Sequence, residues 1–176
     1  TVIGPTFTPG NKVAVSLSTG KNPDIFMLNH AFQKERTLEA NGTINVSPTF
    51  DAAGTKMAFT SNRMGGPQIF MKDMASGSVS RVTKQGNYNT EPSMSPDGTL
   101  IAFSRLTSEG NRIFVQDLTT GTEQQISFGP GNDVLPSFAP DRNESNSPTP
   151  LTSPKITIPA IMTGMIYDPI LSIPVS

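Results

Sequence analysis

A short pattern that starts with proline recurs four times along this 176-residue chain at an almost constant interval. The copies begin at Pro5, Pro48, Pro92 and Pro136, so that the steps are 43, 44 and 44 residues. Two independent markers keep the 44-residue step: an isoleucine-phenylalanine pair at 25–26, 69–70 and 113–114, and one apolar residue at 38, 82 and 126. A period of this length indicates an array of equal supersecondary units, and three markers per unit predict several short elements in each.

The best-preserved copy predicts four short strands. Pro96-Asp97-Gly98 separates two apolar-polar alternations, and this combination of turn residues favours a hairpin. The isoleucine-phenylalanine pair then predicts a third strand, and a second turn at 120–121 leads into a more polar fourth strand over 123–127. Four antiparallel strands in about 44 residues are typical of one β-propeller blade.

The repeat therefore predicts an all-β fold, a partial β-propeller of four-stranded antiparallel blades. No segment has the three- and four-residue apolar spacing of a helix, which excludes an α-solenoid, and a sandwich does not need strands in repeating sets of four. The expected blades are about 5–47, 48–91 and 92–135, with a fourth starting at 136. Such an open ring leaves two unpaired faces, so a homodimer through the open propeller edges is a further hypothesis.

The segment 142–176 does not continue the repeat. Arg142 stands where the turn glycine is expected, no isoleucine-phenylalanine pair follows near 157, and prolines recur at intervals that disfavour both helix and interior strand. We expect an irregular or poorly ordered tail. A slipped reading frame or a fusion would explain it, and an unusual natural extension is the alternative.

Composition excludes several classes of partner and chemistry. With 13 basic and 14 acidic residues, the chain offers no electrostatic basis for nucleic-acid binding or for an anionic membrane surface. Without cysteine there is no thiolate ligand or nucleophile, and no apolar run is long enough for a membrane-spanning helix. We expect no cofactor and no direct membrane insertion.

Catalytic residues are not evident. His30 is the single histidine and falls where a turn should follow a third strand, and no Gly-x-Ser-x-Gly motif offers a nucleophile. The aspartates 73, 97, 117 and 141 stand at turns, where a carboxylate accepts local backbone hydrogen bonds. We therefore predict a protein that is not an enzyme and has no metal site.

One polar set differs from these turn residues. Asn45, Asn89 and Asp133 each lie three residues before a repeat proline, in the segment that enters the innermost strand of a blade. Successive blades should present them side by side at the rim of the central channel. They either cap the inner strands or bind a partner, and a channel cation is a weaker possibility because hard cations need about six oxygen ligands.

The segments 60–73 (TSNRMGGPQIFMKD), 85–98 (QGNYNTEPSMSPDG) and 95–104 (SPDGTLIAFS) resemble the repeats of the TolB propeller family, over roughly residues 1–141. The resemblance implies a periplasmic six-bladed propeller of the Tol-Pal system, preceded by a small α/β domain. It also implies docking of the peptidoglycan-associated lipoprotein Pal, support of outer-membrane integrity, and opportunistic binding of colicin segments. The alternatives are a propeller fragment of a prolyl oligopeptidase-like or tricorn-like peptidase and a small-ligand-binding periplasmic propeller.

In the TolB-like interpretation the rim loops belong to the face that receives Pal. The expected partner-binding residues are Asn45, Ser47, Tyr88, Asn89, Thr90, Glu91 and Asp133. Among them Asn89, Thr90 and Glu91 are expected to form hydrogen bonds, and Tyr88 is expected to stack on a docked peptide.

Overall fold

The computed structural model describes residues 2–18, 20–139, 155–157 and 170–172, which form strands and turns without a helix. Blade A contains β1 (Val2–Phe7), β2 (Val13–Leu17), β3 (Asp24–Leu28) and β4 (Lys34–Glu39). Blade B contains β5 (Asn45–Phe50), β6 (Lys56–Ser61), β7 (Gln68–Asp73) and β8 (Val79–Arg81). Blade C contains β9 (Asn89–Met94), β10 (Leu100–Thr107), β11 (Gly110–Asp117) and β12 (Glu123–Gln125). Each blade is an antiparallel sheet whose strands pair in chain order, which confirms the four-stranded blades predicted from the repeat.

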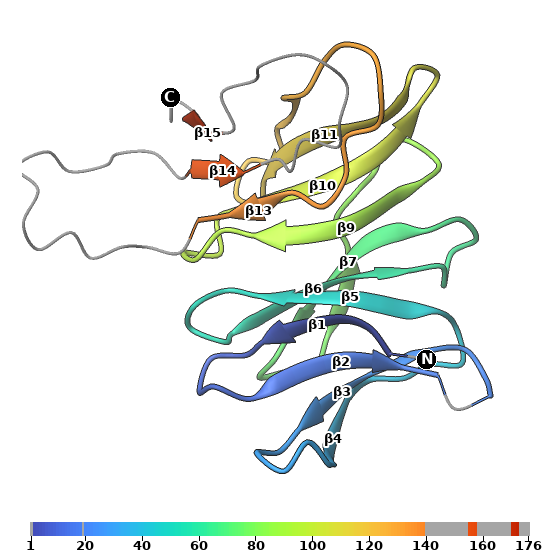
Figure 1. Ribbon diagram of the computed structural model, residues 1–176, viewed down its shortest axis with the longest axis vertical. Helices are drawn as coiled ribbons and strands as arrows, with labels where there is room; N and C mark the ends of the chain where they lie inside the picture. The colour runs from blue at the N-terminus through green and yellow to red at the C-terminus, as the bar shows by residue number, and fades with distance from the viewer. Residues whose placement is uncertain (1, 19, 140–154, 158–169, 173–176) are drawn as a thin grey trace, which may run out of the picture.

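The blades stand beside one another in an open arc, with the first strand of each blade, the inner strand, next to its equivalent in the neighbouring blade (Figure 1). A further inner strand, β13 (Ser137–Phe138), follows blade C and pairs with β14 (Lys155–Thr157), which pairs with β15 (Ile170–Ser172). The proline spacing did not predict these two short strands. Residues 140–154, 158–169 and 173–176, and with them most of the tail for which a slipped frame was suggested, lie outside the described residues.

Every inner strand carries the same bulge. Gly4, Ser47, Glu91 and Leu135 occupy equivalent positions directly before the repeat proline, and all have φ of 56° or 57°. In β1, β5 and β9 the pairing register shifts at this point. An extra residue in a left-handed conformation lets the ladder continue on both sides of the proline. β5 and β9 therefore begin at Asn45 and Asn89, three residues before the blade boundaries expected from the sequence.

The core lies between blades rather than inside one sheet. Blade B places Met57, Phe59 and Phe70 against Ala14 and Leu38 of blade A. Blade C repeats this arrangement against blade B, with Met94, Ile101 and Phe103 packed on Ala58 and Val82. Phe59 and Phe103, which are equivalent in the repeat, are fully buried at these two junctions.

The face of blade A that turns away from blade B has no neighbouring blade among the described residues. Phe7, the equivalent of Phe50 and Met94 in the repeat, is 76% exposed there. Its counterpart Phe138 packs against blade C and is 8% exposed. The same repeat position is thus buried or half-buried where a preceding blade exists and exposed at the start of the arc.

An ion cluster closes the junction between blades A and B. Glu39 at the end of β4 accepts hydrogen bonds from Arg63 at 2.8 Å and from Lys72 at 2.9 Å, both in blade B. Only 8% of the Glu39 side chain is exposed. Because the three groups come from neighbouring blades, the cluster holds one blade to the next.

The turn aspartates act as predicted. The Asp73 carboxylate accepts the backbone N–H groups of Ala75 and Ser76, and the Asp117 carboxylate those of Thr119 and Thr120. The bond from the Ser76 N–H contributes most to lowering the pKa of Asp73 from 3.8. The bond from the Thr120 N–H does the same for the pKa of Asp117. Asp97 accepts the N–H of Thr99 in the same way, and Asp141 lies outside the described residues.

Candidate functional site

The loops that lead into the inner strands, together with the loops between the second and third strands of each blade, form one face of the arc, which we call the rim face (Figure 1, right). Equivalent backbone bonds tie these loops together across each blade junction. The N–H of Asn45 donates to Pro23 O at 2.9 Å, that of Asn89 to Pro67 O at 2.9 Å, and that of Asp133 to Asn111 O at 3.0 Å. The structure therefore places the three repeat-related residues at one level in successive blades.

The side chain of Asn89 is fully buried rather than presented at the surface. Its Nδ2 donates to Gln68 Oε1 at 2.8 Å and to Gln85 O at 2.9 Å, and its Oδ1 accepts from Arg105 Nε at 2.7 Å. Both ends of the amide are occupied within the fold. The structure thus assigns Asn89 the capping role, the first of the two roles considered for this set.

Asn45 repeats the arrangement in blade B. It is also fully buried, donates to Asn41 Oδ1 at 2.9 Å and to Thr43 O at 3.0 Å, and accepts from Arg63 at 3.0 Å. Asp133 differs, because it is partly exposed and its carbonyl accepts the hydroxyl of Ser104 at 3.0 Å. Because the two asparagines are buried, the residues next to them in the sequence form the surface of the rim face.

Each buried asparagine holds an arginine over a pair of aromatic rings. The Arg63 guanidinium lies 4.8 Å from the centroid of Phe70, and that of Arg105 lies 4.3 Å from that of Phe114. Arg105 also forms a two-pronged ion pair with Glu123 at 2.5 and 2.7 Å. Cation–π contacts and bidentate pairs stabilise a desolvated guanidinium. Each arginine with its asparagine and aromatic partners, which we call an arginine clamp, therefore holds a loop of the rim face in place.

The bulge residues bring the expected site residues Ser47 and Glu91 to the rim face beside Leu135. Glu91, in β9 of blade C, contacts the units on both sides. Its N–H donates to Thr60 Oγ1 of blade B at 3.2 Å, and its Oε2 accepts the N–H of Leu135, two residues before β13, at 3.0 Å. Ser47 and Thr90 are partly exposed. Glu91 is partly exposed too, so its carboxylate is available to a group on a partner.

Large exposed apolar side chains gather on this face. Of the eight such side chains among the described residues, five lie in rim loops and one, Leu106, lies at the end of β10 beside them: Ile44, Met64, Tyr88, Leu106, Phe128 and Leu135. Tyr88 is 44% exposed, Leu106 52% and Leu135 56%, and the N–H of Leu106 donates to Tyr88 O at 3.0 Å. Exposed apolar side chains concentrated at one place mark interaction surfaces.

Of this apolar group, sequence reasoning identified only Tyr88. The repeat contained the missing signal, because Ile44 is the equivalent of Tyr88 and Leu135 is the equivalent of Glu91 at the 44-residue step. Leu106 had no such signal, since its equivalent in blade B is Asn62.

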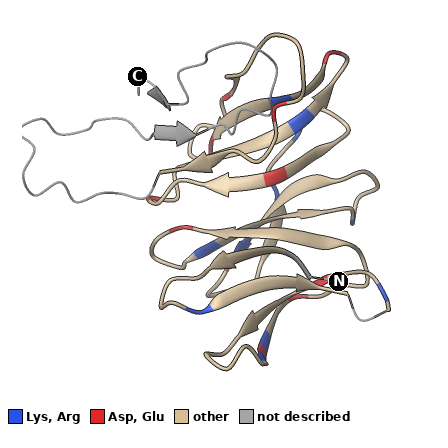
Figure 2. Ribbon diagram, in the orientation of Figure 1, with Lys and Arg blue, Asp and Glu red and all other residues tan. Residues whose placement is uncertain are grey.

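His30 is exposed in the turn between β3 and β4, as predicted, and no three metal-ligating side chains cluster among the described residues. In Figure 2 the acidic and basic residues of the described part of the chain are scattered over several strands and turns. None of the described residues belongs to a helix long and apolar enough to cross a membrane. The rim face, with its exposed apolar side chains and the partly exposed carboxylate of Glu91, is suited to docking a protein.

Comparisons with known proteins give a consistent result. The family model described as "TolB beta propeller domain" matches residues 1–144. The "Tol-Pal system protein TolB" of Nitratidesulfovibrio vulgaris is 78% identical over 59 residues, which are 34% of this chain and 13% of that protein.

Two solved structures share the fold. The TolB structure from Acinetobacter baumannii has a TM-score of 0.72 and 23% identity, over 98% of this chain and 43% of that one. A putative TolB from Agrobacterium tumefaciens has a TM-score of 0.69 and 15% identity, over 93% of this chain and 62% of that one. The chain therefore spans less than two thirds of the length of these relatives.

Proposed function

This chain belongs to the TolB β-propeller family, and we propose that it is a non-catalytic protein-binding propeller of the Tol-Pal envelope system in the periplasm. The identity with a relative named as a Tol-Pal system protein supports this role. The observation that carries the proposal is the number of exposed apolar side chains on the rim face, among them Leu135, whose N–H donates to the partly exposed Glu91 carboxylate. A surface of this composition is suited to a protein partner rather than to a small polar substrate.

The proposed partner is the peptidoglycan-associated lipoprotein Pal, whose docking would support outer-membrane integrity, and colicin segments would compete for the same face. Tyr88 and Leu135 supply the apolar anchors, and Glu91 and Asp133 supply carboxylates for donors on the partner. Ser47 and Thr90 contribute at the edge of this surface. Asn45 and Asn89 act indirectly, because their buried amides hold the arginines beneath the loops.

The proposal predicts that the double variant Tyr88→Ala/Leu135→Ala binds Pal about tenfold to a hundredfold more weakly than the wild-type chain, since buried interface anchors dominate binding energy. Titration calorimetry with purified Pal measures the change. Phe32→Ala is the matched control, because Phe32 is 74% exposed in the turn between β3 and β4, which is not part of the rim face. Equal affinity of wild type and double variant would refute the rim site, and no binding by the folded wild-type chain would refute Pal as the partner.

The homodimer suggested by the open ring remains a proposal. It is supported by the apolar face of blade A, where Phe7 is 76% exposed at a position that is buried or half-buried in the other blades. We expect a concentration-dependent increase of mass in light scattering that Phe7→Asp abolishes. A monomer at every concentration would eliminate the dimer and leave the Pal proposal unaffected.

A further inference from the structure

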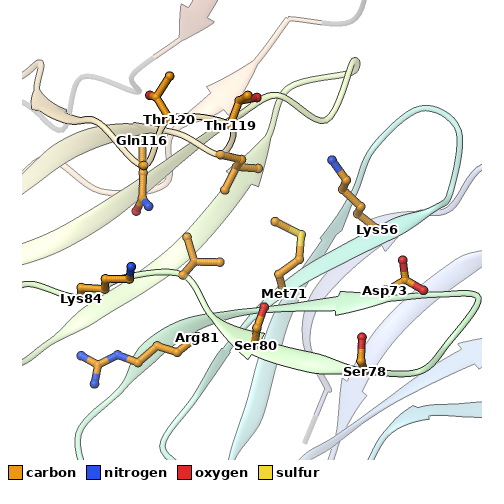
Figure 3. A pocket seen from close by; sticks show the side chains of 13 residues that line it. Lys56, Met71, Asp73, Ser78, Ser80, Arg81, Lys84, Gln116, Thr119 and Thr120 are labelled. Carbon is orange, nitrogen blue, oxygen red and sulfur yellow. The ribbon is translucent and has the colours of Figure 1, made fainter.

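A groove lies between blades B and C, and of its lining residues only Val82 and Lys84 belong to a loop that leads into an inner strand. It encloses about 520 Å³ and is bounded by Lys56, Arg81 and Lys84 of blade B and by Gln116 and Thr119 of blade C. Figure 3 shows these polar side chains extending from both walls. Small-molecule sites commonly occupy about 300–1,000 Å³, so the groove is large enough for an organic ligand.

The internal repeat offers a direct comparison, because the junction between blades A and B is built from equivalent residues. There Lys72 crosses the junction to Glu39 at 2.9 Å. The residues 44 positions later are Gln116 and Thr83, and the Thr83 hydroxyl instead donates to Gln68 Oε1 at 2.7 Å within blade B. The ion pair that bridges one junction is therefore replaced at the other by two neutral residues that do not bond to each other.

The groove lining is net positive, because Lys56, Arg81 and Lys84 stand against a single carboxylate, that of Asp73. Arg81 uses Nε to bind Thr83 O, while its two terminal nitrogens, like the ammonium of Lys84, have no acceptor in this part of the chain. Lys56 donates to Gly98 O at 3.0 Å. The nearby Asp73 carboxylate accepts the N–H groups of its own turn. An anion in the groove would therefore meet several cationic donors.

Gln116 provides an independent indication of a ligand. Its side chain is 8% exposed, and its buried Oε1 has no hydrogen-bond partner among the described residues. A buried carbonyl oxygen without a hydrogen-bond partner destabilises the fold, and an apolar residue of similar size would avoid that cost. The amide end of Gln116 points from β11 toward the side of the groove where Lys84 and Arg81 lie (Figure 3).

We propose that this groove binds an anionic saccharide. The planar guanidinium of Arg81 pairs with the sugar carboxylate, for which its paired N–H groups are well suited, and Lys84 adds a second charge. Gln116 Oε1 accepts a sugar hydroxyl, and Ser80 and Thr119 offer further hydroxyl partners along the walls. Met71 and Leu118 supply apolar surface for the C–H face of a sugar ring.

The test is a calorimetric titration of the purified chain with tri-galacturonic acid, with the neutral sugar maltotriose as the comparison ligand. We expect binding of the acidic sugar alone, weakened about tenfold or more in Arg81→Ala/Lys84→Ala because the charge-assisted bonds are lost. Lys21→Ala, which removes an exposed lysine in blade A, should bind as wild type does.

Gln116→Leu separates a ligand-binding role from a structural one. We expect this variant to bind the acidic sugar several-fold more weakly while its midpoint of urea unfolding stays constant or rises, because the unpaired carbonyl is removed. Equal binding of maltotriose, wild-type affinity in the Arg81/Lys84 variant, or no binding by the folded chain at saturating sugar would overturn the proposal. Equally tight binding of hexaglutamate would also overturn it, because the sugar hydroxyls would then contribute nothing.

Discussion

Arg105→Ala is expected to lower the free energy of unfolding by about 3 kcal/mol, because it leaves the largely desolvated carboxylate of Glu123, whose side chain is 12% exposed, without its partner. Arg105 is 6% exposed, and it is bound to Glu123 through two hydrogen bonds and to Asn89 through a third. Alanine also removes the cation from the face of Phe114. Urea unfolding followed by circular dichroism measures the loss.

Two further variants show whether the unpaired charge causes this loss. Arg36→Ala truncates an exposed arginine on β4 and should change stability by no more than about 0.5 kcal/mol. Arg105→Ala/Glu123→Ala should recover part of the stability lost in the single variant, because the carboxylate is removed together with its partner. A single variant as stable as the Arg36 control would show that the clamp does not stabilise the fold.

Glu39→Gln is expected to lower the free energy of unfolding by about 3 kcal/mol at neutral pH, since Arg63 and Lys72 then lose their shared charge partner. The two cations are themselves poorly exposed, with 17% and 20% of their side chains accessible. Glu35→Gln is the control, because it removes a half-exposed surface pair with Lys12 that contributes little. Equal unfolding midpoints of the two variants would contradict the prediction.

The same carboxyl makes stability depend on pH. Burial alone raises the pKa of Glu39, but hydrogen bonds and charges from Lys72 and Arg63 outweigh burial and hold the pKa below 4.5. The unfolded chain therefore binds a proton at a higher pH than the native chain does. The stabilisation is present above 4.5 and is lost as the pH falls through the native pKa. The wild type should lose more stability than Glu39→Gln when urea unfolding is repeated at progressively lower pH below 4.5.

The 44-residue repeat predicted the blade architecture because each marker reports a physical requirement of the blade. The isoleucine-phenylalanine pair marks a strand buried between blades, and Pro96-Asp97-Gly98 marks a turn that few other residues can form. The sequence placed the blade boundaries at Pro48 and Pro92, but β5 and β9 begin at Asn45 and Asn89. A proline normally indicates the edge of a ladder, and here the strand continues on both sides of it. Only backbone coordinates reveal the bulge that lets the strand continue past it.

The candidate site was predicted in position but not in detail. Spacing located Asn45, Asn89 and Asp133 at the rim, yet it does not indicate whether a side chain points outward or inward. The decisive contacts come from Arg63 and Arg105, which are 42 positions apart and therefore out of step with the repeat. The connection between β6 and β7 is longer than that between β10 and β11, so the two arginines reach the same place from different positions.

The bulge in front of each repeat proline keeps one backbone conformation, whereas the side chain at that position differs from blade to blade. Its left-handed backbone is the same at Gly4, Ser47, Glu91 and Leu135, although these residues carry no side chain, a hydroxyl, a carboxylate and an isobutyl group. A mutation at Ser47 or Leu135 changes the side chain that the rim face presents, and the residues of the core between blades stay the same. A few base changes at these positions can therefore alter which partner the rim face prefers, while the arrangement of the blades is kept.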